Sequence, residues 1–501
     1  MLAATILGSS ITFIDGTVVN VALPVLQRAL GTDMVGAQWV VESYALMLSS
    51  LILVGGSLGD RKGRRRVFSA GVLLFTVASA ACGLAQSAAQ LIAARAVQGV
   101  GAALLVPGSL AIISASFPEE ERGRAIGTWS GFTSIAAGVG PVLGGWLVEH
   151  ASWRWIFFIN LPLAAVVLAL TWWRVPESRD ETAKGSVDVL GAATAALGLG
   201  GVVYGLIESG TRGFGDARVS VSLAAGLALL VVFVLVEHRR GTRAMIPLSL
   251  FRSSSFTGAN LLTLCLYGAL SGLFFFLPFD LIQVQGYSPT EAGAALVPFV
   301  LTMFLLSRWA GGLVRRRGAR LPLVIGPVVA AAGFALFLWP GARAGSYWTS
   351  FFPAVMLMSL GMATSVAPLT TTVMDSVDER HAGVASGINN AVSRTAGLIS
   401  IAVLGVVITG VFARDFNARL APLDLPDTTR LELASQESHL AAIRVPEQLS
   451  DDARLAVERA VEESFVSGFR VVILICSALA LVSALCAWLL IEGSVKNRVT
   501  R

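Results

Sequence analysis

The sequence predicts an all-α polytopic membrane protein. Of its 501 residues, 55% are hydrophobic and only 14% are charged, whereas about a quarter of the residues of a soluble domain carry charge. Apolar runs of about 20 residues recur along most of the chain, and each is long enough to cross a bilayer as a helix. A transmembrane barrel would instead show short segments that alternate polar and apolar residues, and the sequence has no such segments.

The first six spans are apolar runs separated by short polar loops. Asp15 lies midway along the first run, where a cleaved signal peptide would be purely apolar, and no basic segment precedes that run. We therefore expect a retained helix, and the abrupt start leaves open whether the native chain begins upstream. The six spans lie at about 3–26, 37–58, 67–86, 89–113, 124–147 and 155–174.

Eight further apolar runs bring the expected number of spans to fourteen. Two of them follow the first block directly, and six close the chain after a second basic stretch. They lie at about 187–208, 219–237, 257–281, 289–309, 320–340, 349–371, 384–412 and 467–491.

The short loop 56–66 predicts the orientation of all these spans. Five of its residues are Lys or Arg, a charge that the bilayer core excludes and that is typical of cytoplasmic loops. Loops 238–252 and 313–320 fall on the same side and are also basic, whereas 283–288 on the opposite side contains neither Lys nor Arg. We expect a multi-pass protein of the inner (plasma) membrane with both termini in the cytoplasm.

Residues 414–465, here called the acidic segment, are expected on the extracytoplasmic side. They contain six arginines against eleven carboxylates. The spacing of Leu, Ala and Val within 429–462 predicts one or two short surface helices. We interpret the acidic segment as a solvated cap or hairpin, with a lid that captures substrate as the alternative.

An internal repeat indicates that the spans form two similar halves. Residues 311–320 repeat 56–65, matching two glycines, a leucine and two arginines, although Asp60 is replaced by Arg315. Glu121-Arg122 likewise recurs as Glu379-Arg380. Transporters built from repeats hold their site between the repeats. The expected domains are a six-helix half at 1–175, two inserted helices with a linker at 176–252, and a second six-helix half at 253–501.

Four motifs carry a resemblance to a known family. They are Asp15-Gly-Thr-Val-Val-Asn-Val-Ala-Leu-Pro24 in the first span, the loop 56–65, Arg95-Ala-Val-Gln-Gly-Val-Gly101 in the fourth span, and Gly140-Pro-Val-Leu-Gly-Gly145 in the fifth. With these motifs in their expected helices and order, the sequence resembles the major facilitator superfamily, in its fourteen-helix drug/proton antiporter branch (EmrB/QacA type). The resemblance covers essentially the whole chain. It implies the major facilitator fold and proton-coupled multidrug efflux.

Three charged residues are candidates for proton coupling. Asp15 lies near mid-bilayer, where a charge costs several kcal/mol, so it must be paired, protonated or functional. We favour proton binding over a structural hydrogen bond with Thr17 or Asn20. Arg95 is alone in an apolar run and needs a partner, either Asp15 or Glu42; the resemblance implies that this arginine takes part in proton transfer.

Glu42 lies near the outer end of the second span. A carboxylate at that depth could meet external protons or a cationic substrate. The alternative is an interfacial side chain that extends to the headgroup region.

A second group of residues is predicted to line the substrate cavity. Asp280 follows a run of phenylalanines in the ninth span, and carboxylates with aromatic rings attract lipophilic cations. Asn260 and Tyr267 are seven residues apart, on roughly one face of the same helix. Asp280, Asn260, Tyr267 and Phe275 are therefore candidates, with an interfacial aromatic belt as the alternative.

The two remaining motifs predict a gate and a tight helix contact. The loop resembles the cytoplasmic gate of the family, whose residues here are Gly56, Gly59, Asp60, Arg61, Gly63, Arg64 and Arg65; charge that only sets topology is the alternative. Gly140, Pro141, Gly144 and Gly145 match the antiporter signature. Small residues at this spacing let helices approach closely, and a dry contact prevents proton leak.

Other function classes fit the sequence less well. The chain has four histidines, all in loops or at span ends, and no pattern of a metal site or nucleophile, so we do not expect an enzyme. A non-transport membrane receptor or enzyme stays the remote alternative. None of its three lysines lies in a G-K-[ST] phosphate loop, so no cofactor is expected. The energy must come from an ion gradient, as we expect, or from a separate subunit. Sodium coupling stays open.

The expected partners are a lipophilic small molecule, protons and the lipid bilayer. Nucleic acid is not expected, because the cations cluster in predicted cytoplasmic loops. A dedicated exporter of a single metabolite or antibiotic is the alternative function, and the need for a periplasmic adaptor protein stays open.

Overall fold

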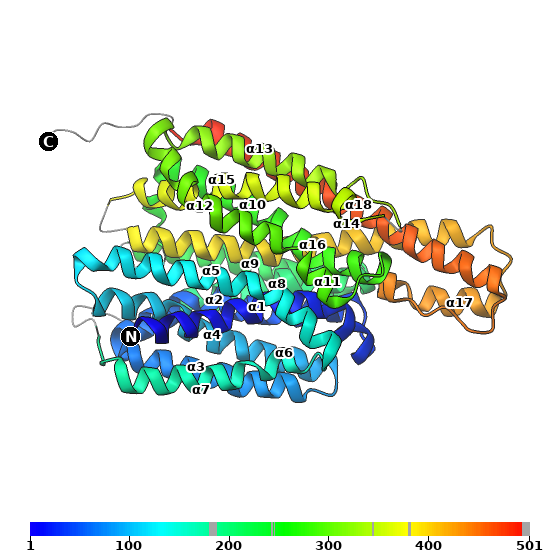
Figure 1. Cartoon of the computed structure of the whole chain (residues 1–501), viewed down its shortest axis with the longest axis horizontal. Helices are drawn as coiled ribbons and strands as arrows, with labels where there is room; N and C mark the ends of the chain where they lie inside the picture. The colour runs from blue at the N-terminus through cyan, green and yellow to red at the C-terminus, as the bar shows by residue number, and fades with distance from the viewer. Residues whose placement is uncertain (180–187, 242–243, 245, 343–344, 379–381, 493–501) are drawn as a thin grey trace. The chain divides into compact units, whose positions relative to one another are not determined.

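A computed structural model describes residues 1–179, 188–241, 244, 246–342, 345–378 and 382–492. Within these ranges the regular structure is helical and contains no strand. The first six spans are α1 (Leu2–Leu30), α2 (Met34–Lys62), α3 (Arg64–Leu84), α4 (Ala88–Ser116), α5 (Glu119–His150), and the pair α6 (Trp155–Phe158) and α7 (Asn160–Arg174). They run side by side in Figure 1.

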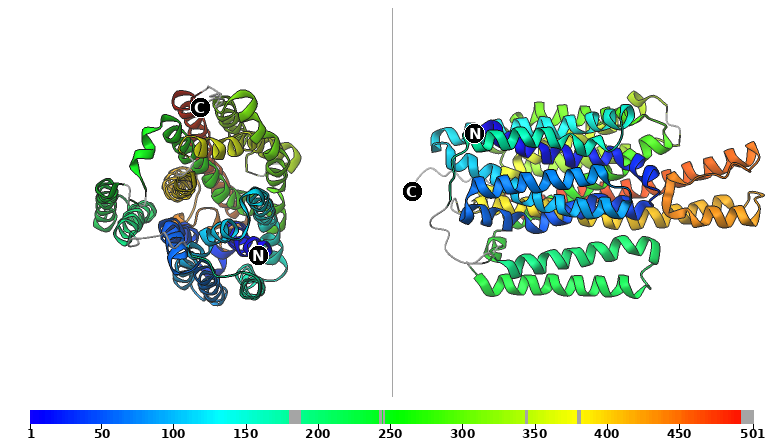
Figure 2. Two further views of the ribbon diagram at one scale, coloured as in Figure 1. Left: turned by 90° about the vertical axis from the view of Figure 1, so that its left-hand side faces the viewer. Right: turned by 90° about the horizontal axis from the view of Figure 1, so that it is seen from below.

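The helices that follow complete the predicted set. They are α8 (Val189–Arg212), α9 (Ala217–Arg240), η2 (Leu248–Arg252), α10 (Ser254–Phe279), the π-helix η3 (Asp280–Val284), α11 (Pro289–Ala294), α12 (Val297–Arg317), α13 (Arg320–Leu336), α14 (Tyr347–Ser350), α15 (Phe352–Asp375), α16 (Ala382–Leu420), α17 (Asp427–Ser435), η5 (Glu437–Ala442) and α18 (Asp451–Leu490). The inserted helices α8 and α9 run as an adjacent pair (Figure 2).

The expected all-helical membrane fold is confirmed. Thirteen helices in the described part of the chain are long and apolar enough to cross a membrane, and α13 is a shorter apolar helix. Together these helices cover all fourteen predicted spans. The tenth span differs in detail, because residues 289–309 fall on two helices, α11 and α12, instead of one.

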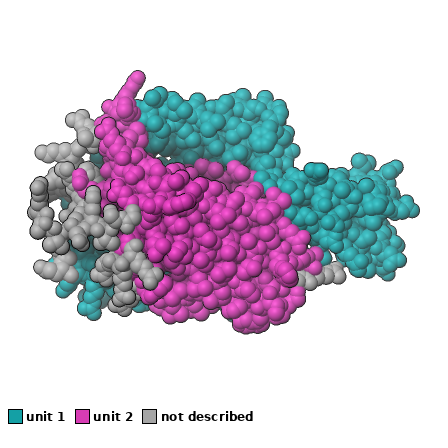
Figure 3. Space-filling model, turned by 90° about the horizontal axis from the view of Figure 1, so that it is seen from above, with its two compact units in different colours: residues 1–236, 277–294, 405–468 teal, residues 237–276, 295–404, 469–501 magenta. Residues whose placement is uncertain are grey.

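The chain forms two compact units, which Figure 3 colours separately. Unit 1 comprises Met1–Val236, Leu277–Ala294 and Gly405–Gly468, and unit 2 comprises Glu237–Phe276, Ala295–Leu404 and Phe469–Arg501. Helices α10, α16 and α18 each contribute to both units. The predicted division into two six-helix halves and an inserted pair stays a prediction.

The core of unit 1 forms where α2 and α3 pack on α4 and where α1 packs on α7. Phe68, Phe75, Leu105 and Val167 are fully buried members of this core. Polar side chains define where the helices begin: Asp33 accepts a hydrogen bond from the Gly36 amide at the start of α2, as N-cap residues do. The polar side chains described below lie on these packed helices.

The acidic segment differs from its predicted structure. Helix α16 continues to Leu420 and α18 begins at Asp451, so much of the segment consists of two long helix extensions and not of short surface helices alone. Arg419 pairs with Asp415 one turn earlier and with Glu463 on α18. Such i,i+4 pairs stabilise exposed helices. Figure 1 shows α17 and the start of α18 together, beyond the ends of α1 and α2.

Candidate functional site

Asp15 and Arg95 form a buried ion pair between α1 and α4. The Nη1 atom of Arg95 lies 2.5 Å from Oδ2 of Asp15, and each residue is only 1% exposed. The sequence offered Asp15 or Glu42 as the partner of Arg95, and the geometry selects Asp15. The alternative bond to Thr17 is not formed, because the Thr17 hydroxyl donates to backbone carbonyls of its own helix.

Two amide side chains complete the hydrogen bonding of Asp15. Gln98 donates Nε2 to Oδ1 of Asp15 at 2.9 Å, and its Oε1 accepts from Arg95 at 2.8 Å. Asn160, the first residue of α7, donates Nδ2 to the same Oδ1 at 3.2 Å and to the hydroxyl of Ser79 at 3.0 Å. Sequence analysis did not identify Asn160, because its contact joins positions 145 residues apart.

Arg95 is also fixed from α2. Its Nε donates to the carbonyl of Val40 at 3.1 Å, and its guanidinium carbon lies 4.2 Å from the centre of the Tyr44 ring. A desolvated cation over an aromatic face gains about 2 kcal/mol. The arginine of the fourth-helix motif therefore ties α4 to both α1 and α2.

Glu42 lies on α2, two residues after Val40, whose carbonyl accepts from Arg95. Its side chain is completely buried, and neither carboxylate oxygen has a hydrogen-bond partner among the described residues. A side chain that extends to the membrane interface would be exposed, so that alternative does not describe this structure. Glu42 is thus a second buried carboxylate in unit 1, separate from the Asp15–Arg95 pair.

The antiporter motif packs α5 against α1 and α11. A Cβ atom added to Gly144 would lie 2.9 Å from Val18 of α1, and one added to Gly140 would collide with Thr17. At Gly145 it would meet the backbone of Pro289, and Gly293 has the reciprocal contact with the Pro141 carbonyl. The motifs of the first and fifth spans therefore touch each other directly.

The predicted gate is a tight junction between two helices and not an extended loop. Gly63 alone separates α2 from α3, with φ of 106°, a conformation that favours glycine. Asp60 bonds to Arg64 one turn later, with Oδ1 2.8 Å from Nη2. Gly56 lies in ordinary contact with Pro107, Gly59 has open space beside it, and Arg61 and Arg65 are half-buried.

Glu177, which the sequence analysis missed, caps the start of α3. Its Oε1 accepts a hydrogen bond from the Arg65 amide at 3.0 Å, and its Oε2 lies 3.6 Å from Nε of Arg66. A Cβ at Gly63 would lie 2.6 Å from this carboxylate. The carboxylate at the N-terminus of α3 is thus supplied by Glu177, whereas Asp60 pairs with Arg64.

We expect Glu177→Gln to lower the stability of the protein more than Asp60→Asn. Loss of a charged N-cap costs about 1 kcal/mol, whereas an exposed i,i+4 pair contributes about 0.3–0.5 kcal/mol. The midpoint of thermal unfolding in detergent measures the loss of stability in each variant. High salt should make the two losses more similar, because it screens the charges. A larger loss for Asp60→Asn would show that Asp60 has the more important contact.

The predicted substrate residues lie at different depths along α10 and η3. Asn260 and Asp280 are separated by 20 residues, about 30 Å along the helical path. Asn260 is buried and accepts a hydrogen bond from Asn389 of α16 at 3.2 Å. Phe275 and Asp280 are also buried, and Tyr267 is half-buried. Their role in substrate binding stays a prediction.

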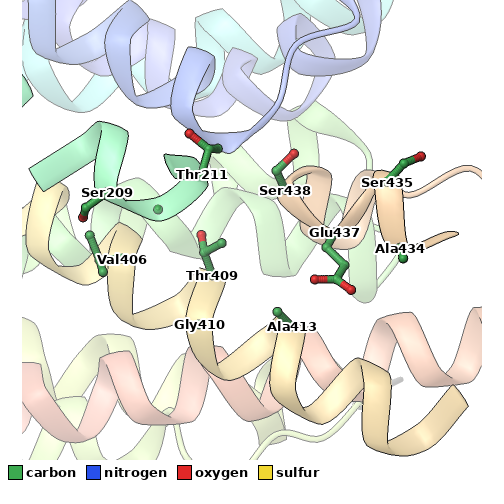
Figure 4. A pocket seen from close by; sticks show the side chains of 11 residues that line it. Ser209, Thr211, Val406, Thr409, Gly410, Ala413, Ala434, Ser435, Glu437 and Ser438 are labelled. Atoms are coloured by element: carbon green, nitrogen blue, oxygen red, sulfur yellow. The ribbon is translucent and has the colours of Figure 1, made fainter. Parts of the chain in front are cut away.

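A pocket of about 350 Å³ lies at the end of α8, against α16 and η5. Figure 4 shows it between the end of α8, α16, and the α17–η5 region, with the Glu437 side chain directed toward α16. Glu437 accepts a hydrogen bond from Asn417 at 2.8 Å. Apart from Glu437, the pocket is lined by side chains that bear hydroxyl groups or are small and apolar. The sequence pattern did not predict this pocket.

Some predicted features lie beyond the part of the chain that the structure describes. The second copy of the Glu-Arg pair, Glu379-Arg380, lies outside the described residues, as does the C-terminus. Among the residues that the structure describes, no group of three or more His, Cys, Asp or Glu is placed to hold a metal ion.

Comparisons with known proteins agree with this architecture. The sequence profile of the Major Facilitator Superfamily matches residues 5–401. The multidrug resistance protein Stp of Mycobacterium tuberculosis is 35% identical over 97% of this chain and 91% of its own length. The tetracenomycin C resistance and export protein of Streptomyces glaucescens is 33% identical over 96% and 90%.

Solved structures show the same fold. A bacterial homologue of the human lysosomal transporter Spinster, in an inward-facing and unoccupied conformation, aligns with a TM-score of 0.66 and 17% identity over 97% of this chain and 96% of that one. At this identity the likeness concerns the fold alone.

Proposed function

This chain belongs to the Major Facilitator Superfamily, and we propose that it is a proton-coupled antiporter that exports lipophilic drugs or toxic compounds from the cytoplasm. The export of drugs follows from relatives that span nearly the whole chain and are named for multidrug resistance and antibiotic export. Proton coupling, the lipophilic substrate and the direction of transport are the parts that need their own tests.

The observation that carries proton coupling is that two buried carboxylates of unit 1 lie on the contacting helices α1 and α2, whereas the third, Asp280, lies at the start of η3. Asp15 on α1 and Glu42 on α2 are both inaccessible to water, and ionisable groups within a membrane are expensive and mark ion pathways. Arg95 joins the two helices that bear them. No bound cofactor is needed for this activity, and the energy comes from the proton gradient.

The orientation of the chain in the membrane is proposed from the distribution of its basic residues. The chain is a multi-pass membrane protein, and its basic residues around 56–66 place that end in the cytoplasm by the positive-inside rule. On this arrangement, the plasma membrane holds both termini inside. The pocket and the acidic segment then lie on the outer side, where exported compounds leave.

A dedicated exporter of one antibiotic is the second candidate. The observation that favours it is the relative from Streptomyces glaucescens, which is named for a single compound, tetracenomycin C. The two candidates differ only in the breadth of substrates, so one panel of compounds tests both.

Drug accumulation in cells tests the proposed function. In a bacterial host deprived of its own drug exporters, expression of the chain should lower accumulation of tetraphenylphosphonium and of neutral lipophilic antibiotics. A protonophore should abolish the difference. Reduced accumulation of one compound class alone would favour the dedicated exporter. Unchanged accumulation of every compound, with the protein present in the membrane, would contradict drug export.

A further inference from the structure

We propose that Glu42 is the residue that takes up and releases the transported proton, whereas Asp15 is the fixed hydrogen-bonding partner of Arg95. This inference rests on the proposed function and assigns the roles of its two buried carboxylates. The two residues differ in their hydrogen bonding, and that difference carries the argument.

Both carboxylate oxygens of Asp15 accept hydrogen bonds. Its Oδ2 accepts from Arg95 at 2.5 Å, and its Oδ1 accepts from Gln98 at 2.9 Å and from Asn160 at 3.2 Å. Hydrogen bonds to a charged carboxylate are about twice as strong as neutral ones. Protonation of Asp15 would leave the buried Arg95 without a counter-charge, which costs about 3–5 kcal/mol. The transported proton is therefore not expected to bind there.

Glu42 lacks all of these stabilising contacts. Both of its oxygens are buried and unpartnered in the described structure, and burial of an unpaired charge is strongly unfavourable. The neutral acid is therefore the form that this conformation accepts, and ionisation requires that the site opens or that a partner arrives. A group with this property can hold a proton in one conformation and release it in another.

The charged groups on the elements packed against α2 do not compensate Glu42. From α4 comes Arg95, which is held by Asp15 of α1. Helix α1 also carries Arg28, whose side chain is exposed. From α8 comes Glu208, whose carboxylate bonds to Arg212 at 2.8 Å and accepts from the indole of Trp39 at 3.4 Å.

The remaining neighbours of α2 also leave Glu42 unpaired. From η5 comes His439, whose ring Nδ1 is buried without a hydrogen-bond partner among the described residues and whose backbone carbonyl accepts from Gln27 at 3.2 Å. The other charged residue of η5, Glu437, accepts from Asn417 at 2.8 Å. From α3 comes Cys82, whose thiol lies 3.6 Å from Oε1 of Gln98. Toward α16, α2 presents the uncharged Gln38, which lies against Gly405.

Glu42 is mechanically linked to the ion pair. The carbonyl of Val40, two residues before Glu42 on α2, accepts from Nε of Arg95 at 3.1 Å. A movement of α2 that opens the site of Glu42 must therefore alter the hydrogen bonding of Arg95. Once Glu42 has lost its proton, attraction between its charge and the guanidinium favours a second arrangement of α2 and α4. Proton binding at Glu42 and helix movement are coupled in this way.

Infrared difference spectroscopy of the purified protein tests the assignment without any drug. Asp280 is a further buried carboxyl group of unit 1, so every sample carries Asp280→Asn. Stepping this parent protein from acid to alkaline pH should remove a carbonyl stretching band of a buried carboxylic acid. Glu42→Gln should lack this band. Ser43→Ala is the matched control, since Ser43 is the adjacent buried residue and also has an unpartnered oxygen; its spectrum should keep the band.

Each outcome decides the proposal. Loss of the band in Glu42→Gln with retention in Ser43→Ala supports it. A band that persists in Glu42→Gln, or an Asp280→Asn parent protein without a titrating band, overturns it. If Glu42→Gln is not monodisperse, Glu42→Asp replaces it, and a band at an unchanged position then overturns the proposal. Failure of drug export in cells with the band intact would instead overturn only the proposed function.

Discussion

Asp15→Asn is expected to abolish gradient-driven export while the protein still inserts into the membrane. The substitution leaves Arg95, which is 1% exposed, as a buried cation without its counter-charge, at about 3–5 kcal/mol. Even 2 kcal/mol of that penalty changes a conformational equilibrium about 30-fold. Uptake of tetraphenylphosphonium into energised inverted vesicles measures the loss.

Two further variants separate charge from packing at this position. Thr12→Val, one turn earlier on α1, removes a buried hydroxyl that bonds only to the carbonyl of Ser9, and should leave uptake nearly unchanged. Asp15→Asn combined with Arg95→Gln removes both charges and should restore thermal stability relative to Asp15→Asn alone, because the two residues are coupled. Undiminished uptake by Asp15→Asn would remove the ion pair from the mechanism.

Gly145→Ala is expected to reduce export at least about fivefold. The added methyl group would meet the backbone of Pro289 at the contact between α5 and α11, with its carbonyl carbon at 2.6 Å. Overpacking of this kind costs about 1–3 kcal/mol, which shifts the balance between conformations about 5- to 150-fold. The same amount of destabilisation should appear as a lower midpoint of thermal unfolding.

Gly131→Ala provides the matched control on the same helix. A Cβ at Gly131 meets nothing within 4 Å, so the identical substitution should leave export and thermal stability unchanged. Equal effects of the two variants would mean that the glycines of α5 matter for helix flexibility and not for close contact.

The length of the apolar runs was sufficient to predict the membrane-spanning helices. Fourteen runs correspond to fourteen apolar helical regions, since a bilayer leaves few alternatives to a helix of about 20 residues. Helix ends outside the membrane were not predictable in the same way. Helix α16 passes the predicted end at 412 and reaches Leu420 because pairs such as Arg419–Asp415 prolong it.

The candidate site was predictable only in part. A lone arginine in an apolar run required a partner, so the sequence narrowed the choice to Asp15 or Glu42. It could not select between them, because the choice depends on how α1, α2 and α4 face one another. Asn160 and Glu177 were not identified because their contacts join distant segments. Asn160 is the first residue of α7, and Glu177 lies in the non-helical segment after α7, where polar residues are common.

The most direct test of the account is proton movement in inverted vesicles that contain the purified chain. After the lumen is acidified, each lipophilic cation or neutral antibiotic that the chain exports should release protons from the lumen as it enters. Antiport predicts that this release vanishes in Asp15→Asn and Glu42→Gln while the vesicles stay sealed. Uptake of a compound with no accompanying proton movement would contradict proton-coupled export.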